Sequence, residues 1–235
     1  MPYLYIKNYW ELVYLNSGDV MYNNIKVEIE KYLKKYPLAI YIYKQLIQIG
    51  DVYAMGGLLR EYRDHSEIIE LRDADFTINI KNRKMWNELL EQVPHKNNQF
   101  GGYKFVCSGF IIDVWDVKTT WAFKKGKVKI ENENYFDNLT KTVFLNLDAI
   151  VYDLTNEKWN DQAYQNALKK GEVGIVLKDN PFEELNILRA MILREKYDMK
   201  YSSELARILL NYFKNENFYE DMLKMQNERY GYVIL

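Results

Sequence analysis

The sequence has very little cysteine and histidine, and its charges nearly cancel. It contains one cysteine, Cys107, and two histidines, His65 and His95. One cysteine cannot form an internal disulfide, and it leaves no cysteine cluster for zinc. Both histidines stand among polar residues and indicate no Ser-His-Asp triad, so we interpret them as surface residues. The net charge of −1 provides no global basic field to attract nucleic acid, although a local patch could still bind it.

Long apolar runs are also absent. The first ten residues lack the basic start and the continuous apolar stretch of a signal peptide. No segment reaches the roughly 18 apolar residues that a transmembrane helix needs. We therefore expect a soluble, cytoplasmic protein without a membrane partner. Its 235 residues suffice for a large core, in one domain or in a larger domain with a helical appendage.

Hydrophobic periodicity predicts strands in the middle of the chain and helices toward both ends. The predicted strands are residues 52–55, 68–80, 103–107, 110–117 and 143–153, with a hairpin turn at Ser108-Gly109. The predicted helices are residues 23–48 (two helices with a break at Pro37), 58–62, 82–92, 182–197, 202–213 and 218–230. This pattern is typical of an α+β fold with a helical C-terminal portion.

Two aspartates on one predicted strand suggest a metal site. Asp73 and Asp75 are two residues apart, so both side chains point to the same face of the sheet, and the other face is apolar. Like charges this close repel one another unless a cation or water screens them. Magnesium prefers carboxylate and phosphate oxygens. The alternative interpretation is the solvated outer face of an edge strand.

A glycine pair, Gly56-Gly57, lies between a predicted strand and a predicted helix. A backbone without side chains can approach a phosphate closely, and the N-terminus of the following helix favours anions. A turn or packing role is at least as common for such a pair. Arg60, one helical turn further on, could reach a phosphate or cover the surface.

A third carboxylate comes from the predicted strand 110–117. Asp113 interrupts this apolar strand, and a buried carboxylate is costly without a partner. We expect such an interruption where a neighbouring strand supplies one more metal ligand. Asp116 points to the opposite face and is the second choice. Three carboxylates with two metal ions can activate an attacking oxygen and stabilise a leaving pyrophosphate.

A basic run follows these aspartates. Its lysines are Lys118, Lys124, Lys125, Lys127 and Lys129. A solvated face is the usual explanation of such a run, and steering of a polynucleotide end toward Asp113 is the alternative. Thr119 and Lys118 are candidates for the lining of the substrate pocket. Trp121 either stacks on a base or closes the core beyond the hairpin.

The order of these motifs resembles the nucleotidyltransferase superfamily, whose palm is similar to that of DNA polymerase β. The motifs are Gly56-Gly57 with Arg60, then Asp73-Ala-Asp75, then Ile112-Asp113. The branch that they most resemble is the head domain of bacterial poly(A) polymerases and CCA-adding enzymes. Residues 148–152 resemble the family's Asn-Ala-Ile-Ala-Tyr strand, and residues 182–190 resemble the start of its neck helix. The resemblance spans roughly residues 38–200.

This resemblance implies a palm with a mixed β-sheet in residues 1–155 and a helical, neck-like domain in residues 156–235. It implies that Gly56, Gly57 and Arg60 hold a nucleoside triphosphate, while Asp73, Asp75 and Asp113 act as catalytic ligands of Mg²⁺. The chain departs from the family in three places. The family's Arg-Arg-Asp-Phe-Thr run is not recognisable, Asp148 replaces an asparagine, and Asn186 replaces an arginine that helps to select the base.

Two functional hypotheses follow. The first is a metal-dependent transfer of NMP from an NTP to an acceptor hydroxyl, on an RNA 3′ end, a small molecule or a protein. Small stand-alone members of the superfamily often act in toxin–antitoxin or phage-defence systems. The alternative is a non-catalytic nucleotide- or partner-binding module on the same fold. The presence of all three carboxylates favours the enzyme.

Overall fold

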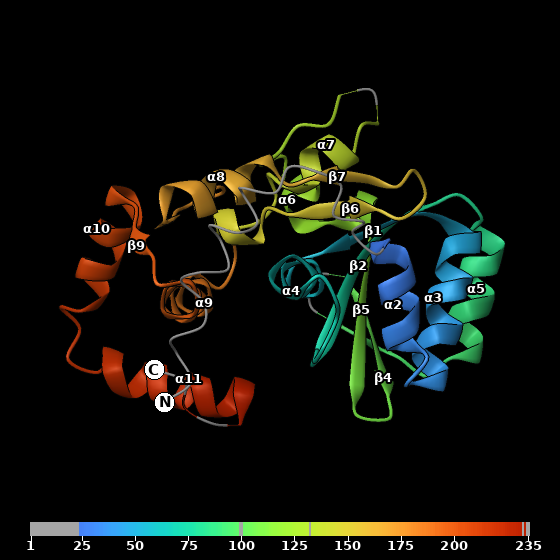
Figure 1. The fold of residues 1–235 in the computed structure, drawn as a ribbon, viewed down its shortest axis with the longest axis horizontal. Helices are drawn as coiled ribbons and strands as arrows, with labels where there is room; N and C mark the ends of the chain where they lie inside the picture. The colour runs from blue at the N-terminus through green and yellow to red at the C-terminus, as the bar shows by residue number, and fades with distance from the viewer. Residues whose placement is uncertain (1–23, 99–100, 132, 232, 234–235) are drawn as a thin grey trace.

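The computed structural model describes residues 24–98, 101–131, 133–231 and 233. A seven-stranded mixed sheet separates two groups of helices (Figure 1). Helices α2 (Ile25–Leu33), α3 (Pro37–Ile49) and α5 (Arg83–Gln92) lie side by side on one side of it. The C-terminal helices lie on the far side of the molecule. The expected α+β class is confirmed.

The two N-terminal helices are separated as the proline predicts. Asn24 caps α2, because its side chain accepts a hydrogen bond from the backbone N–H of Lys26. Pro37 occupies the first turn of α3, where its missing N–H has no helical partner to lose. The chain then passes directly from Ile49 into the first strand, so the glycine at position 50 both ends α3 and begins the sheet.

The sheet has the order β3-β4-β5-β2-β1-β6-β7. Its strands are β1 (Gly50–Met55), β2 (Asp73–Ile80), β3 (Lys96–Asn97), β4 (Tyr103–Cys107), β5 (Phe110–Asp116), β6 (Val151–Asp153) and β7 (Lys158–Asn160). Strands β2 and β5 are parallel, and the other neighbours are antiparallel. The parallel pair requires a crossover, and α5 provides it.

Strand β2 alternates between a buried and a half-exposed face. Ala74, Phe76 and Ile78 are fully buried, and the Phe76 ring contacts Tyr43 of α3. The apolar face therefore packs against the N-terminal helices. Asp73 and Asp75 lie on the opposite face, away from α3, as the period of two predicts.

The remaining helices lie outside the group formed by α2, α3 and α5 (Figure 1). They are α4 (Gly57–His65), α6 (Trp121–Lys124), α7 (Phe136–Leu139), α8 (Gln162–Lys170), α9 (Glu183–Tyr197), α10 (Ser203–Tyr212) and α11 (Phe218–Tyr230). Two short 3₁₀ helices, η1 and η2, span Val117–Thr119 and Asn146–Asp148. Strands β8 (Glu172–Val173) and β9 (Lys200–Tyr201) form a separate parallel pair.

The prediction of a continuous strand over residues 143–153 is wrong. Only Val151–Asp153 is a strand of the sheet, and Asn146–Asp148 is the 3₁₀ helix η2. The residues before β6 pair with other parts of the chain. Leu145 forms an isolated bridge with Ile175. The Asn146 side chain donates a hydrogen bond to the carbonyl of residue 172 and accepts one from the N–H of residue 174. Hydrophobicity alone could not reveal those partners.

The strand predicted for residues 68–80 begins later, at Asp73. Residues before Asp73 have no strand to pair with, because β1 pairs with β2 only as far as Asp75 and β5 only as far as Asp73. Strands also occur after residue 152, in β7, β8 and β9. The domain boundary expected at residue 155 stays a prediction, and β7 of the same sheet follows it. Within the described ranges, no helix is long and apolar enough to cross a membrane.

Candidate active site

The parallel pairing of β2 with β5 brings the three predicted aspartates to one face of the sheet. Asp75 lies directly opposite Asp113 in the register, and Asp73 lies opposite Ile111. Because side chains alternate with a period of two, Asp73, Asp75 and Asp113 all project from the face that α3 does not cover. Two neighbouring strands thus contribute three carboxylates to one small area.

Asp75 is the most perturbed of the three. Burial and the nearby charges of Asp73 and Asp113 raise the pKa of the Asp75 carboxyl to about 7. Arg189 of α9 opposes this shift. Among the described residues, no side chain or backbone group donates a hydrogen bond to the Asp75 carboxylate. A carboxylate in this position needs a proton or a cation.

Asp113 has one oxygen satisfied and one not. Its side chain is buried, and Oδ2 accepts a hydrogen bond from Lys104 Nζ at 3.0 Å. Oδ1 is buried and has no hydrogen-bond partner among the described residues. Burial raises the pKa of the Asp113 carboxyl, and the Lys104 ammonium counteracts part of that effect. An unpartnered buried oxygen is an available ligand atom.

Asp73 is more exposed and pairs with its neighbour in the sequence. Arg72 donates from both Nε and Nη2 to Asp73 Oδ2, at 3.1 and 2.8 Å. Arg72 also donates to the backbone carbonyl of Arg229, near the C-terminal end of α11. The last helix therefore reaches the edge of the acidic site.

The glycine turn lies against this site. Gly56 has φ 66° and ψ −130°, a backbone conformation that residues with a Cβ rarely adopt. A Cβ added there would stand 3.3 Å from Asp75 Oδ2. Helix α4 begins at the next residue, Gly57, so its N-terminal amides lie close to the Asp75 carboxylate. The turn is therefore next to Asp75.

The Arg60 side chain lies beside the glycine turn, with Nη2 3.9 Å from a Cβ added at Gly57, and its predicted phosphate contact stays a prediction. Its guanidinium is buried and forms an ion pair with Asp148, which is also paired with Arg189 at 2.9 Å. Burial alone would raise the pKa of Asp148, but Arg189 and Arg60 hold it below its usual value. This buried triad joins α4, η2 and α9. Sequence reasoning did not predict Arg189 as part of it.

Asp116, the second choice for a ligand, has a structural role. Its side chain caps η1 by accepting from the Lys118 backbone N–H at 3.0 Å, and it pairs with Arg83. The Thr119 hydroxyl donates to the Asp116 carbonyl at 3.1 Å. Lys118 is exposed. The predicted contact of Lys118 and Thr119 with substrate stays a prediction.

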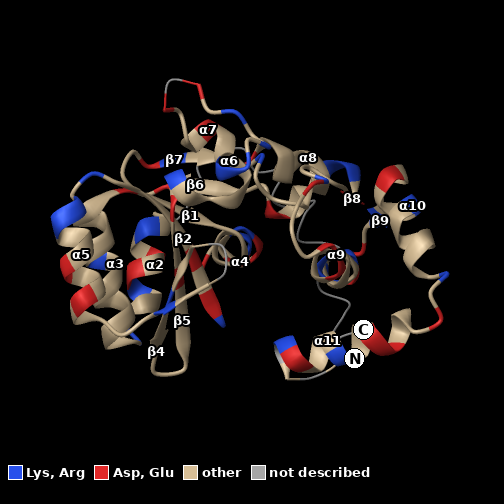
Figure 2. Cartoon of the chain, turned by 180° about the vertical axis from the view of Figure 1, so that it is seen from behind, with Lys and Arg blue, Asp and Glu red and all other residues tan. Residues whose placement is uncertain are grey.

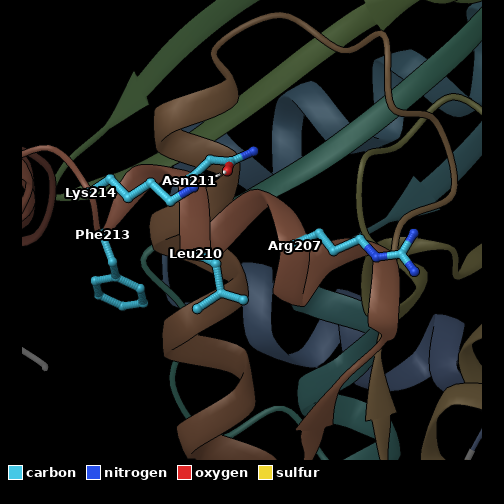
Figure 3. A pocket seen from close by; sticks show the side chains of 5 residues that line it. All are labelled: Arg207, Leu210, Asn211, Phe213 and Lys214. Carbon is cyan, nitrogen blue, oxygen red and sulfur yellow. Dashed lines mark hydrogen bonds between the residues drawn. The ribbon is translucent and has the colours of Figure 1, made fainter.

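The basic run is spread over exposed positions around α6 (Figure 2). Lys127 pairs with Asp179 at 2.7 Å, and the other lysines of the run are exposed. One surface hollow includes Lys127 and Lys129 of this run. Another lies along α10, where Leu210 and Phe213 are exposed between Arg207 and Lys214 (Figure 3). Neither hollow includes an aspartate of the site.

The donor set of the site fits Mg²⁺, although its side chains are not yet arranged around an ion. In the part of the chain that the structure describes, no three acidic, histidine or cysteine side chains already form a metal-binding group. Lys104 and Arg72 hold two of the three carboxylates instead. The partnerless Oδ1 of Asp113 and the carboxylate of Asp75 are the hard oxygen donors that Mg²⁺ prefers.

Comparison with known proteins supports the fold. No family model matches the chain, and no curated protein matches it. Among solved structures, a CCA-adding enzyme with ATP is similar over 86% of this chain and 50% of its own, with a TM-score of 0.56 and 16% identity. A CCA-adding enzyme in its apo form is similar over 83% of this chain and 47% of its own, with a TM-score of 0.52 and 17% identity.

A CCA-adding enzyme with CTP gives a TM-score of 0.51 at 16% identity, over 77% of this chain and 44% of its own. The chain thus spans about half the length of these enzymes. The expected resemblance to the nucleotidyltransferase superfamily is confirmed at the level of the fold. At 16–17% identity the similarity shows the fold and not the activity.

Proposed function

We propose that this chain is a cytoplasmic, metal-dependent nucleotidyltransferase that moves NMP from an NTP to an acceptor hydroxyl. The observation that carries the proposal is the register of β2 and β5, which sets Asp75 opposite Asp113 with Asp73 beside them. The Gly56 turn, within contact distance of Asp75, supports a phosphate site at the same place. The fold shared with CCA-adding enzymes that were solved with ATP and CTP is consistent with this assignment.

Each residue has a role in this proposal. Asp73 and Asp75 would hold Mg²⁺ together with the triphosphate, and Gly56 and Gly57 would let the backbone approach the phosphates. Asp113 would orient the attacking hydroxyl and accept its proton. Mg²⁺, when bound, supplies the positive charge that a departing pyrophosphate requires. Arg60 would position the N-terminus of α4 through Asp148, and its Nη2 beside Gly57 would contact the phosphates.

The reaction balances without a further reactant. The acceptor oxygen forms a bond to the α-phosphorus, and the bond from that phosphorus to the α–β bridging oxygen breaks. Pyrophosphate leaves with the electron pair of that bond. The proton of the acceptor hydroxyl would pass to Asp113, whose Oδ1 has no hydrogen-bond partner among the described residues.

The acceptor remains a choice among an RNA 3′ end, a small molecule such as an aminoglycoside-like compound, and a protein side chain. Incubating the chain with Mg²⁺, each labelled NTP and each acceptor class in turn tests both the activity and this choice. Asp75→Asn should lower incorporation by about 100-fold or more, since it removes an electrostatic contact in the transition state. Asp179→Asn, a surface change, is the matched control and should have no effect. No incorporation with any acceptor would refute the proposal. A toxin–antitoxin or defence role would follow only if RNA or protein is modified.

One observation favours a second candidate, a non-catalytic nucleotide-binding module. Lys104 and Arg72 already neutralise two of the three carboxylates, so the site can persist without a metal ion. Such a module would bind NTP equally well with and without Mg²⁺. The enzyme should bind NTP tightly only when Mg²⁺ is present.

A further inference from the structure

Lys104 is a cation inside the acidic site that the proposed reaction does not use. It lies opposite Asp113 in the antiparallel register of β4 and β5, so both side chains project from the same face. Its Nζ stands 3.0 Å from Asp113 Oδ2. The lysine side chain is 38% exposed, so its ammonium lies at the boundary between the protein and the space above the sheet.

The two sides of the site differ in how their charge is compensated. Asp113 is buried and pairs with the partly exposed Lys104, which the strand register sets opposite it. Asp73 has Arg72, whose side chain is more than half exposed and comes from outside the strand. Asp75, between them, receives no hydrogen bond in the described part of the chain. Among the described residues, the carboxylate without a paired cation is therefore that of Asp75.

We propose that Lys104 replaces one of the two divalent ions that a three-carboxylate site would otherwise take. The site then holds a single divalent cation at Asp73 and Asp75, and the Lys104 ammonium remains on Asp113 as the second positive charge. This inference rests on the proposed function, because it concerns the ion that accompanies the nucleotide.

Electrostatics gives the reason. A second divalent ion on Asp113 would stand within a few ångströms of the ammonium and would be repelled by it. To bind, it would have to displace a lysine that the register fixes opposite its partner. The ammonium has three N–H donors, and one of them serves Asp113. The other two can donate to the acceptor oxygen or to a phosphate oxygen of the substrate.

Counting bound Mn²⁺ tests this proposal without measuring activity. Mn²⁺ would be titrated into the protein with a saturating amount of α,β-methylene ATP, and free Mn²⁺ would be followed by its EPR signal. The wild type should bind one Mn²⁺ per chain. Lys104→Met should bind two, with broadening from the coupling of two nearby ions. Lys96→Met is the matched control, because Lys96 pairs with Lys104 in the register and is one strand further from Asp113; it should bind one.

Two Mn²⁺ ions in the wild type would overturn the proposal, and so would a folded Lys104→Met variant that still binds one. The wild-type count decides even if the variant does not fold. Binding of the nucleotide analogue with no Mn²⁺ at all would refute the proposed function itself, and the inference with it. Two ions in the wild type would leave the proposed function intact.

Discussion

At the scale of single residues, burial decides how the carboxylates behave. Asp75 and Asp113 are close in space, and burial is the largest cause that raises the pKa of each. Lys104 relieves Asp113, but no cation of the described residues forms an ion pair with Asp75. A free carboxylate there costs stability, and that cost is recovered when a cation binds. The site is thus built to bind an ion rather than to stabilise the protein.

Replacing Asp75 with asparagine should therefore stabilise the metal-free protein at neutral and alkaline pH. In the folded state its pKa is about 7, above the ordinary value of 3.8, so ionisation destabilises the wild type as the pH rises from about 4 to about 7. Because the residue is partly exposed, we expect a gain on the order of 2 kcal/mol at pH 8 in EDTA, falling toward zero near pH 4. Urea unfolding at several pH values measures it, and an Asp75→Asn variant less stable than the wild type at pH 8 would contradict this account.

At the scale of elements, the Gly56 turn fixes how close the backbone comes to the carboxylates. Gly56 has a positive φ, and its ψ lies outside the left-handed helical region, so a residue with a Cβ would be strained there. In addition, Asp75 Oδ2 would lie only 3.3 Å from that Cβ. The turn therefore depends on glycine for two separate reasons. Only the second reason involves the site.

A pair of alanine substitutions separates these reasons. Gly171 also has a positive φ, in the left-handed helical region at the end of α8, and nothing lies within 4 Å of a Cβ added there. Gly171→Ala should cost about 1 kcal/mol of stability and leave nucleotide binding unchanged. Gly56→Ala should cost more, roughly 2–3 kcal/mol, and also weaken Mg²⁺-dependent NTP binding. Thermal unfolding and calorimetric titration measure the two effects. Equal costs with unchanged binding for both variants would show that the turn is unrelated to the site.

At the scale of the whole molecule, an ion triad around the buried Asp148 connects α4 and η2 to α9. Asp148 pairs with Arg60 of α4 and with Arg189 of α9. Nearby, Asp64 of α4 pairs with Lys196 and accepts from the Tyr197 hydroxyl of α9. The two helices are therefore joined by polar contacts, which hold α9 beside α4.

Asp148→Asn should destabilise the protein by about 3–5 kcal/mol, because it leaves two arginines without their buried carboxylate. The pKa of Asp148 is lowered in the folded state, so the wild-type advantage is present above pH 4 and is lost as the pH falls through the folded value. Urea unfolding at pH 7 and at pH 3 measures this. Asp179→Asn removes an exposed pair with Lys127 and should have no measurable effect. A similar loss in both variants would show that the triad has no special role.

Some of this architecture was predictable and some was not. The motifs predicted Asp73 and Asp75 on one face, because a period of two is a local property. The pairing of Lys104 with Asp113 was also predictable from the sequence. A two-residue turn at Ser108-Gly109 pairs position 107 with 110, and hence 104 with 113. Arg60 was different, because its partner Asp148 is 88 residues away and comes from a segment whose strand prediction was wrong. Such pairings depend on tertiary packing, which no local pattern contains.

In the proposed function, the carboxylates and the glycine turn together bind an NTP with a divalent ion. Thermal unfolding of the wild type and of Asp75→Asn, with ATP or CTP and with or without Mg²⁺, tests it most directly. With nucleotide at about 100 times its dissociation constant, the wild type should gain about 5 °C or more, only when Mg²⁺ is present. The variant should gain almost nothing. A shift in the wild type that is the same without Mg²⁺, or an equal shift in the variant, would contradict the account.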